Sequence, residues 1–141
     1  MSSNGNRWET TMPATVSNIP VLVDSINGLL EQADCPMKAQ MQIDVALDEI
    51  LANIANYAYG SESGNMTVAY EYDETSRTVV LRFTDAGVPY DPLTAKEPDT
   101  TLSADDRPIG GLGIFLVRKT MDGMSYERKD GMNVLTIRKI I

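Results

Sequence analysis

The stretch Asp48-Glu49-Ile50-Leu51-Ala52-Asn53-Ile54-Ala55-Asn56 decides how the middle of this chain folds. Its apolar residues recur at helical spacing and continue a pattern that runs from Met37 to about Tyr59. The predicted core stripe of this helix consists of Ile43, Leu47, Ile50, Ile54 and Ala58. Glu49 and Asn53 lie one turn apart on a different stripe. The helix is therefore expected to pack on one side and to present a carboxylate and an amide on another.

The other elements are predicted outward from this helix. Toward the N-terminus we expect a strand at 7–12 and an amphipathic helix at 17–34, which Pro36 separates from the central helix. Toward the C-terminus we expect a hairpin of strands 66–72 and 78–84, a helix at 114–121, and a closing hairpin of 124–128 and 133–141. This order predicts an α+β two-layer sandwich, with about three helices on one face of a mixed, mostly antiparallel sheet.

Composition excludes several classes of protein. A chain of 141 residues suits a single domain, and its net charge of −8 argues against binding nucleic acid or an anionic membrane nonspecifically. Cys35 is the only cysteine, so an internal disulfide is excluded. The absence of histidine excludes Ser-His-Asp catalysis and His-based zinc sites. We see no signal peptide and no apolar run near the ~20 residues of a membrane span, so a cytoplasmic protein is expected.

Two downstream motifs add polar and flexible groups to the Glu49/Asn53 pair. Asp85-Ala86-Gly87 ends an apolar run, and it is either a plain strand exit with a positive φ at Gly87 or a carboxylate that accepts a hydrogen bond from a ligand amine. Gly110-Gly111-Leu112-Gly113 precedes a helix, and it is either a hinge or a phosphate cradle. Glu49 and Asn53 alone would be an ordinary exposed helix face. Together the three motifs predict a nucleotide site.

In this order the motifs resemble the GHKL ATPases, whose nucleotide-binding domain has the Bergerat fold. Glu49 and Asn53 match the N-box, Asp85-Ala86-Gly87 matches the first glycine box, and Gly110-Gly111-Leu112-Gly113-Ile114 matches the second. The longer runs at 85–92, 107–114 and 121–136 look like the anti-sigma-factor kinase branch of this family. The resemblance extends from about residue 10 to the C-terminus.

The resemblance implies a role for each of these residues. Glu49 would be the general base or water-orienting carboxylate, and Asn53 would be the protein ligand to Mg²⁺. Asp85 would read the adenine amine, and Gly87 would flank the ring. The phosphates of ATP would be wrapped by the second glycine box, whose residues are Gly110, Gly111, Leu112 and Gly113. Residues from about 88 to 110 would form the ATP lid, and residues 1–6 are expected to be disordered.

The same resemblance implies a serine-protein kinase that transfers the γ-phosphoryl group of ATP to a serine of an anti-sigma antagonist of the STAS type. A sigma factor would be a second partner, and a homodimer is expected by analogy alone. Three departures from the family pattern are visible: Tyr57 where histidine is common, Met132 where threonine is common, and a first helix without lysine or arginine. They motivate an alternative function, an ATP-gated protein-binding module with little catalysis, in a partner-switching pathway.

Overall fold

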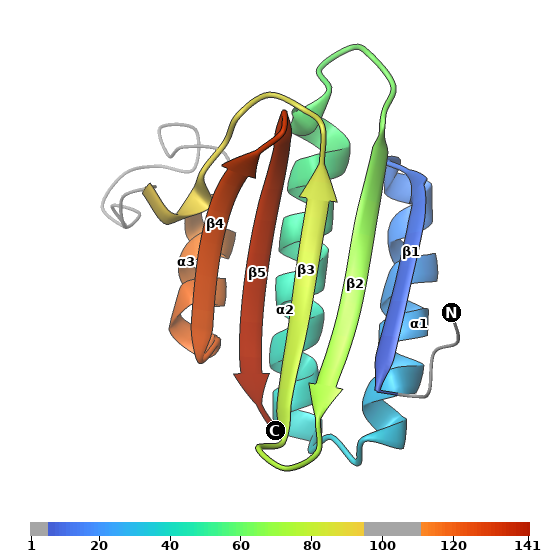
Figure 1. The fold of residues 1–141 in the computed structure, drawn as a ribbon, viewed down its shortest axis with the longest axis vertical. Coiled ribbons are helices and arrows are strands. Elements are labelled where there is room, and N and C mark those ends of the chain that lie inside the picture. The colour runs from blue at the N-terminus through green and yellow to red at the C-terminus, as the bar shows by residue number, and fades with distance from the viewer. Residues whose placement is uncertain (1–5, 95–110) are drawn as a thin grey trace.

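The computed structural model describes residues 6–94 and 111–141, and within them the chain forms two layers. One layer is a five-stranded sheet in the order β1-β2-β3-β5-β4. The other consists of three α-helices, which all lie on the same face of the sheet (Figure 1). Every pair of neighbouring strands is antiparallel, so the predicted α+β sandwich is confirmed with a sheet that is antiparallel throughout these residues.

The strands alternate between buried and exposed side chains, as a sheet with one covered face requires. Their bounds are β1 (Arg7–Pro13), β2 (Asn65–Asp73), β3 (Thr78–Asp85), β4 (Gly123–Lys129) and β5 (Met132–Ile140). The turn between β4 and β5 places Asp130 and Gly131 at positive φ, the backbone conformation that a tight two-residue hairpin turn requires. The central pair β3 and β5 is in a register that puts Asp85 directly opposite Asn133. This cross-strand pair lies at the end of the sheet where the functional residues meet.

The helices bury the stripes that their sequences predict. Their bounds are α1 (Ile19–Gln32), α2 (Met37–Asn53) and α3 (Gly111–Thr120). The core stripe predicted for the central helix is at most 8% exposed at each of Ile43, Leu47, Ile50, Ile54 and Ala58. These side chains pack against the inner face of β2 and β3, where Tyr70 and Phe83 are almost fully buried. Burial of this apolar face holds the helix layer in register with the sheet.

The central helix differs from its prediction at its C-terminal end. The α-helical pattern stops at Asn53, and the next five residues, Ile54–Ala58, form a π-helix. A π-helix widens the turn, and such segments occur often at functional sites. Here the wider turn directly follows Asn53 and carries Tyr57. The third helix also differs, because it begins at Gly111, three residues before the predicted start.

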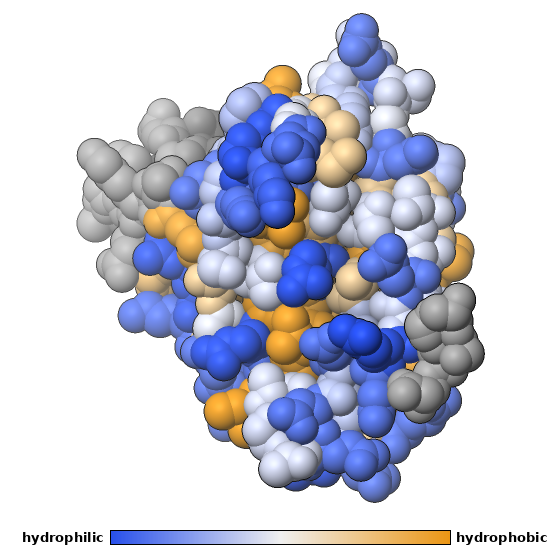
Figure 2. Space-filling model, viewed as in Figure 1, coloured by the Kyte–Doolittle hydropathy of each residue, from blue (hydrophilic) through white to orange (hydrophobic). Residues whose placement is uncertain are grey.

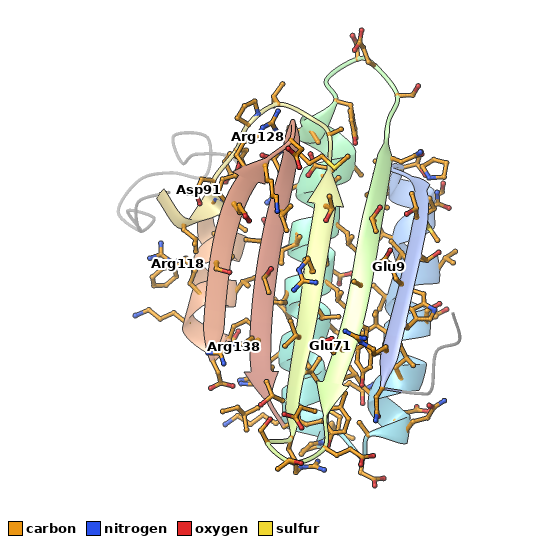
Figure 3. All side chains as sticks on the ribbon, in the orientation of Figure 1. Glu9, Glu71, Asp91, Arg118, Arg128 and Arg138 are labelled. Carbon is orange, nitrogen blue, oxygen red and sulfur yellow. The ribbon has the colours of Figure 1, made fainter. Side chains whose placement is uncertain are left out.

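The face of the sheet opposite the helices is open to solvent. Hydrophilic side chains cover most of this face, with smaller apolar areas between them (Figure 2). Arg7 of β1 and Glu71 of β2 form an exposed ion pair across it, with 2.8 Å between Nη2 and Oε2. Figure 3 labels charged side chains at both sides of this face, Glu9 and Glu71 on β1 and β2, and Arg128 and Arg138 on β4 and β5. The predicted disorder of residues 1–6 and the lid at 88–110 fall largely outside the described residues.

Candidate functional site

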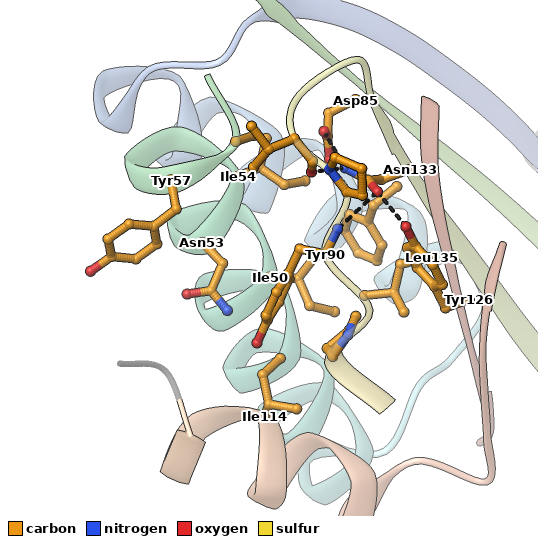
Figure 4. Close-up of a pocket in the computed structure, with 15 residues that line it drawn as sticks. Ile50, Asn53, Ile54, Tyr57, Asp85, Tyr90, Ile114, Tyr126, Asn133 and Leu135 are labelled. Atoms are coloured by element: carbon orange, nitrogen blue, oxygen red, sulfur yellow. Dashed lines mark hydrogen bonds between the residues drawn. The ribbon is translucent and has the colours of Figure 1, made fainter. Parts of the chain in front are cut away.

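A cavity of about 270 Å³ opens between α2, the π-helix, and the adjoining ends of β3, β4 and β5. Its lining side chains come from α2, the π-helix, α3, the three strands β3, β4 and β5, and the loop after β3 (Figure 4). Its polar lining includes Asn53, Asp85, Tyr90, Tyr126 and Asn133, and its apolar lining includes Ile50, Phe83, Val88, Ile114 and Leu135. The cavity therefore combines apolar walls with a few polar groups, as small-molecule sites do.

Asp85 is the charged residue at the closed end of this cavity. It is 7% exposed, and its Oδ1 accepts two hydrogen bonds: from the Gly87 N–H at 2.9 Å and from Asn133 Nδ2 at 3.0 Å. Within the described residues both bonds use Oδ1, which leaves Oδ2 as the acceptor for a ligand. A buried carboxylate held in this way suits recognition of an amine hydrogen of a ligand.

The loop that follows Asp85 is held tightly against the end of the central helix. The Val88 N–H donates to the Ala58 carbonyl at 2.8 Å, and the Ala86 N–H donates to the Tyr59 hydroxyl at 2.9 Å. From the other side, Arg128 Nη1 donates to the Gly87 carbonyl at 2.8 Å, and Figure 3 shows Arg128 at the end of β4 nearest this loop. The position of Asp85 is therefore fixed by the backbone around it.

Gly87 is required for a reason that differs from both sequence interpretations of it. A Cβ at this position would lie 2.2 Å from the Ala58 carbonyl oxygen, far inside van der Waals contact. The glycines with positive φ in the described chain are Gly60 and Gly131, so the expectation of positive φ at Gly87 is wrong. Gly87 permits close packing of backbone on backbone, and the near partner is the chain's own π-helix. Its predicted position beside a bound ring stays a prediction.

Asn53 lines the same cavity, and Glu49 lies beside it in contact with Asn53. Asn53 Nδ2 donates to Glu49 Oε2 at 3.2 Å, so the amide orients the carboxylate one turn away. The other oxygen of Glu49 faces the first turn of α3: a Cβ added to Gly113 would lie 1.9 Å from Oε1. The sequence-predicted pair and the second glycine motif are thus neighbours in space, although more than 50 residues separate them in the chain.

The electrostatic environment of Glu49 favours its neutral form. Burial raises the pKa of this carboxyl above its usual range, and the hydrogen bond from Asn53 lowers it by a smaller amount. Burial raises the pKa of the Tyr90 hydroxyl, and Glu49 raises it further by a smaller amount. The two groups are therefore close enough to interact. A carboxylate with a raised pKa is better suited to accept a proton near neutral pH.

Not all predicted site residues can be placed. Asn53 and Asp85 line the cavity, and Glu49 and Gly113 adjoin it. Gly111 and Leu112 begin α3, which carries Ile114 into the cavity wall. Gly110 lies outside the described residues. No group of three or more cysteine and carboxylate side chains is arranged to hold a metal in the described part of the chain.

Sequence reasoning missed the residue that organises the closed end of the cavity. Asn133 is 6% exposed and contacts Asp85, Val88, Tyr90 and Tyr126 through hydrogen bonds. A polar residue at an inward position of an otherwise apolar strand was the available signal, since Leu135 and Ile137 continue the same face. Tyr90 and Tyr126 were also missed. Both line the cavity, and both donate a hydrogen bond to Asn133 Oδ1.

The described helices include none that is long and apolar enough to cross a membrane. Comparison with known proteins gives one family match: the histidine kinase-like ATPase domain, over residues 12–139. The chain is similar to the serine/threonine-protein kinase BtrW of Bordetella bronchiseptica, with 34% identity over 71% of this chain and 70% of that protein. It is also similar to the serine-protein kinase RsbW of Listeria monocytogenes, with 30% identity over 99% of this chain and 91% of that protein. The RsbW of Bacillus mycoides is 23% identical over 99% of this chain.

These matches agree with the site. The family model includes every predicted site residue, and both kinase relatives cover more than two thirds of the chain. The predicted GHKL resemblance, the predicted kinase class and the use of ATP are therefore confirmed at the level of the family. The chain belongs to the histidine kinase-like ATPase family, in the branch of its serine-protein kinases.

Proposed function

We propose that this protein transfers the γ-phosphoryl group of ATP to a serine of an anti-sigma antagonist, and that it binds and sequesters a regulatory partner such as a sigma factor. The observation that carries the proposal is the convergence of Glu49, Asn53, Asp85 and the first turn of α3 on one cavity. Asp85 offers a buried acceptor for the base inside the cavity, and Glu49 offers a proton acceptor beside it, next to Asn53 and Gly113.

In this proposal each residue has a separate task. Asp85 accepts a hydrogen bond from the adenine amine, and the apolar walls around Phe83 and Leu135 bury the ring. The N-terminal turn of α3 points backbone N–H groups and the positive end of the helix dipole toward the phosphates. Glu49 accepts the proton of the serine hydroxyl. The serine oxygen forms a bond to the γ-phosphorus as the bond from that phosphorus to the leaving oxygen of ADP breaks.

Asn53 fits the role of protein ligand to Mg²⁺. Its Nδ2 is engaged by Glu49 at 3.2 Å, which directs the amide so that the carbonyl oxygen is left for another partner, and its side chain lines the cavity. Mg²⁺ commonly takes one or two protein oxygens and completes its shell with water and phosphate. A bound ion of this kind would neutralise charge on the phosphates.

The test combines binding and transfer. Wild-type protein, incubated with Mg²⁺, γ-labelled ATP and the purified STAS-type antagonists of the same organism, is expected to yield phosphoserine on one of them. Glu49→Ala should lose transfer while titration calorimetry still detects ATP binding. Gly28→Ala is the control, because a side chain added there meets no atom within 4 Å. Absence of transfer to every one of these antagonists by the wild-type protein would refute the kinase proposal.

An ATP-gated binding module remains the second candidate, because α1 carries Asp24 and Glu31 but no lysine or arginine. The same preparations separate the two. Partner binding that depends on ATP and survives Glu49→Ala, without phosphoserine in the wild type, would favour the module. Phosphoserine formation that Glu49→Ala abolishes would favour the kinase.

A further inference from the structure

Asn133 belongs to none of the three sequence motifs, yet its side chain makes four hydrogen bonds at the buried end of the cavity. It lies on β5, directly opposite Asp85 of β3, and it is 6% exposed. Burying a primary amide is costly unless its hydrogen-bonding groups find partners. The partners of Asn133 therefore indicate what the residue is there to hold.

Every hydrogen-bonding position of the Asn133 side chain is used. Its Nδ2 donates to Asp85 Oδ1 at 3.0 Å and to the Val88 carbonyl at 2.8 Å. Its Oδ1 accepts from the Tyr90 N–H at 3.2 Å and from the Tyr126 hydroxyl. Two donors and two acceptors match the capacity of a primary amide and define which way it points. Figure 4 shows this network at the end of the cavity.

The network has two consequences for the cavity. Because Asp85 Oδ1 already accepts from Asn133 and from the Gly87 N–H, the side chain is fixed in place with Oδ2 left as the acceptor for a ligand. Because Val88 and Tyr90 are both bound to the same amide and both line the cavity, Asn133 also positions the wall beside Asp85. One side chain thus sets both the chemistry and the shape of this end.

We infer that Asn133 is a positioning residue that determines base specificity: it keeps Asp85 as a pure acceptor, so that the cavity accepts a 6-aminopurine and rejects a 6-oxopurine. Adenine offers amine hydrogens at this position, whereas hypoxanthine offers an oxygen that would face the carboxylate. The inference rests on the proposed binding of ATP, and it adds that Asn133 determines which purine base the cavity binds.

Asn133→Asp is the informative substitution because it keeps the shape and changes the hydrogen-bonding character. It places a second carboxyl about 3 Å from Asp85, where two carboxylates cannot both ionise cheaply and one proton is shared. The other titratable groups that face position 133 from the packed elements are Tyr126 and Arg128 of β4 and Tyr90 of the loop, with Glu49 beyond Tyr90.

The experiment measures dissociation constants of ATP and ITP by calorimetry between pH 6 and pH 9. Wild type is expected to bind ATP about 10- to 100-fold more tightly than ITP, at a ratio that changes little with pH. Asn133→Asp should bind ATP weakly at pH 9, regain binding as the shared proton is taken up toward pH 6, and discriminate less against ITP there. Asn65→Asp, at an exposed position on β2, controls for the added charge.

Two results would overturn this inference and leave the proposed function unrefuted. One is a wild type that binds ATP and ITP equally. The other is an Asn133→Asp protein whose ATP affinity and ATP-to-ITP ratio do not change between pH 6 and pH 9, whether they match the wild type or are uniformly lowered. A wild type that binds no ATP would instead refute the proposed function together with the inference. Thermal unfolding of each variant shows which of them remain folded.

Discussion

Replacing Gly113 with alanine should displace the carboxylate of Glu49 while leaving the fold intact. The added Cβ would lie 1.9 Å from Glu49 Oε1, whereas ordinary contact begins at 3.4 Å, so the oxygen must retreat by about 1.5 Å. The clashing group is the end of a flexible side chain, so Glu49 can turn aside without movement of the backbone. A misplacement of about 1 Å in a catalytic group can cost ~100-fold in rate.

The effect on stability should be much smaller than the effect on rate. Alanine in place of glycine inside a helix stabilises by roughly 0.5–1 kcal/mol. Turning Glu49 away from its preferred rotamer costs about 0.5–1.5 kcal/mol, so the two terms nearly cancel. In a Glu49→Ala background the clash is absent, and Gly113→Ala should then stabilise by the full ~0.5–1 kcal/mol.

The assay pairs single-turnover phosphotransfer with denaturant unfolding. Gly28→Ala is the matched control, since it makes the same change in a helix where a Cβ meets nothing within 4 Å. We expect Gly113→Ala to reduce the rate of transfer by about 100-fold and Gly28→Ala to leave it unchanged. Calorimetry with ATP separates loss of binding from loss of transfer. A normal transfer rate in Gly113→Ala would refute the placement of Glu49 against α3.

Three further outcomes follow from the site. Asp85→Asn should weaken ATP binding by at least about tenfold in calorimetry, because a charged hydrogen bond is lost and an amide hydrogen faces the base amine; unchanged affinity would contradict the role of Asp85. Asn53→Ala should lower the affinity for Mg-ATP while affecting ATP in the presence of EDTA much less, and an equal loss in both would remove Asn53 from the metal site. Burial raises the pKa of Glu49, so its ionised form costs native stability above that pKa, and the cost disappears as the pH falls. Glu49→Gln should therefore melt at a higher temperature than wild type at pH 7, with a difference that shrinks toward about pH 4 in calorimetric scans; a difference independent of pH would contradict this.

Much of the fold was predictable because the apolar periodicity is strong. The stripe through Ile43, Leu47 and Ile50 and the alternation in β2 and β3 each bury the residues that the pattern selected. Helix ends were harder to predict, because they depend on neighbours. The change to a π-helix after Asn53 coincides with the packing of the Gly87 loop on Ala58, a contact between segments distant in the chain.

The candidate site divides in the same way. The residue types and their order, from Glu49 and Asn53 through Asp85 to the second glycine motif, were determined by the sequence alone, because these motifs are local. Only the tertiary structure decided that Glu49 faces Gly113, that Gly87 packs on Ala58, and that Asn133 holds Asp85. Local periodicity specifies which face of an element is buried. Which polar groups meet across that buried face depends on sheet register and helix packing, and neither is encoded in any single segment.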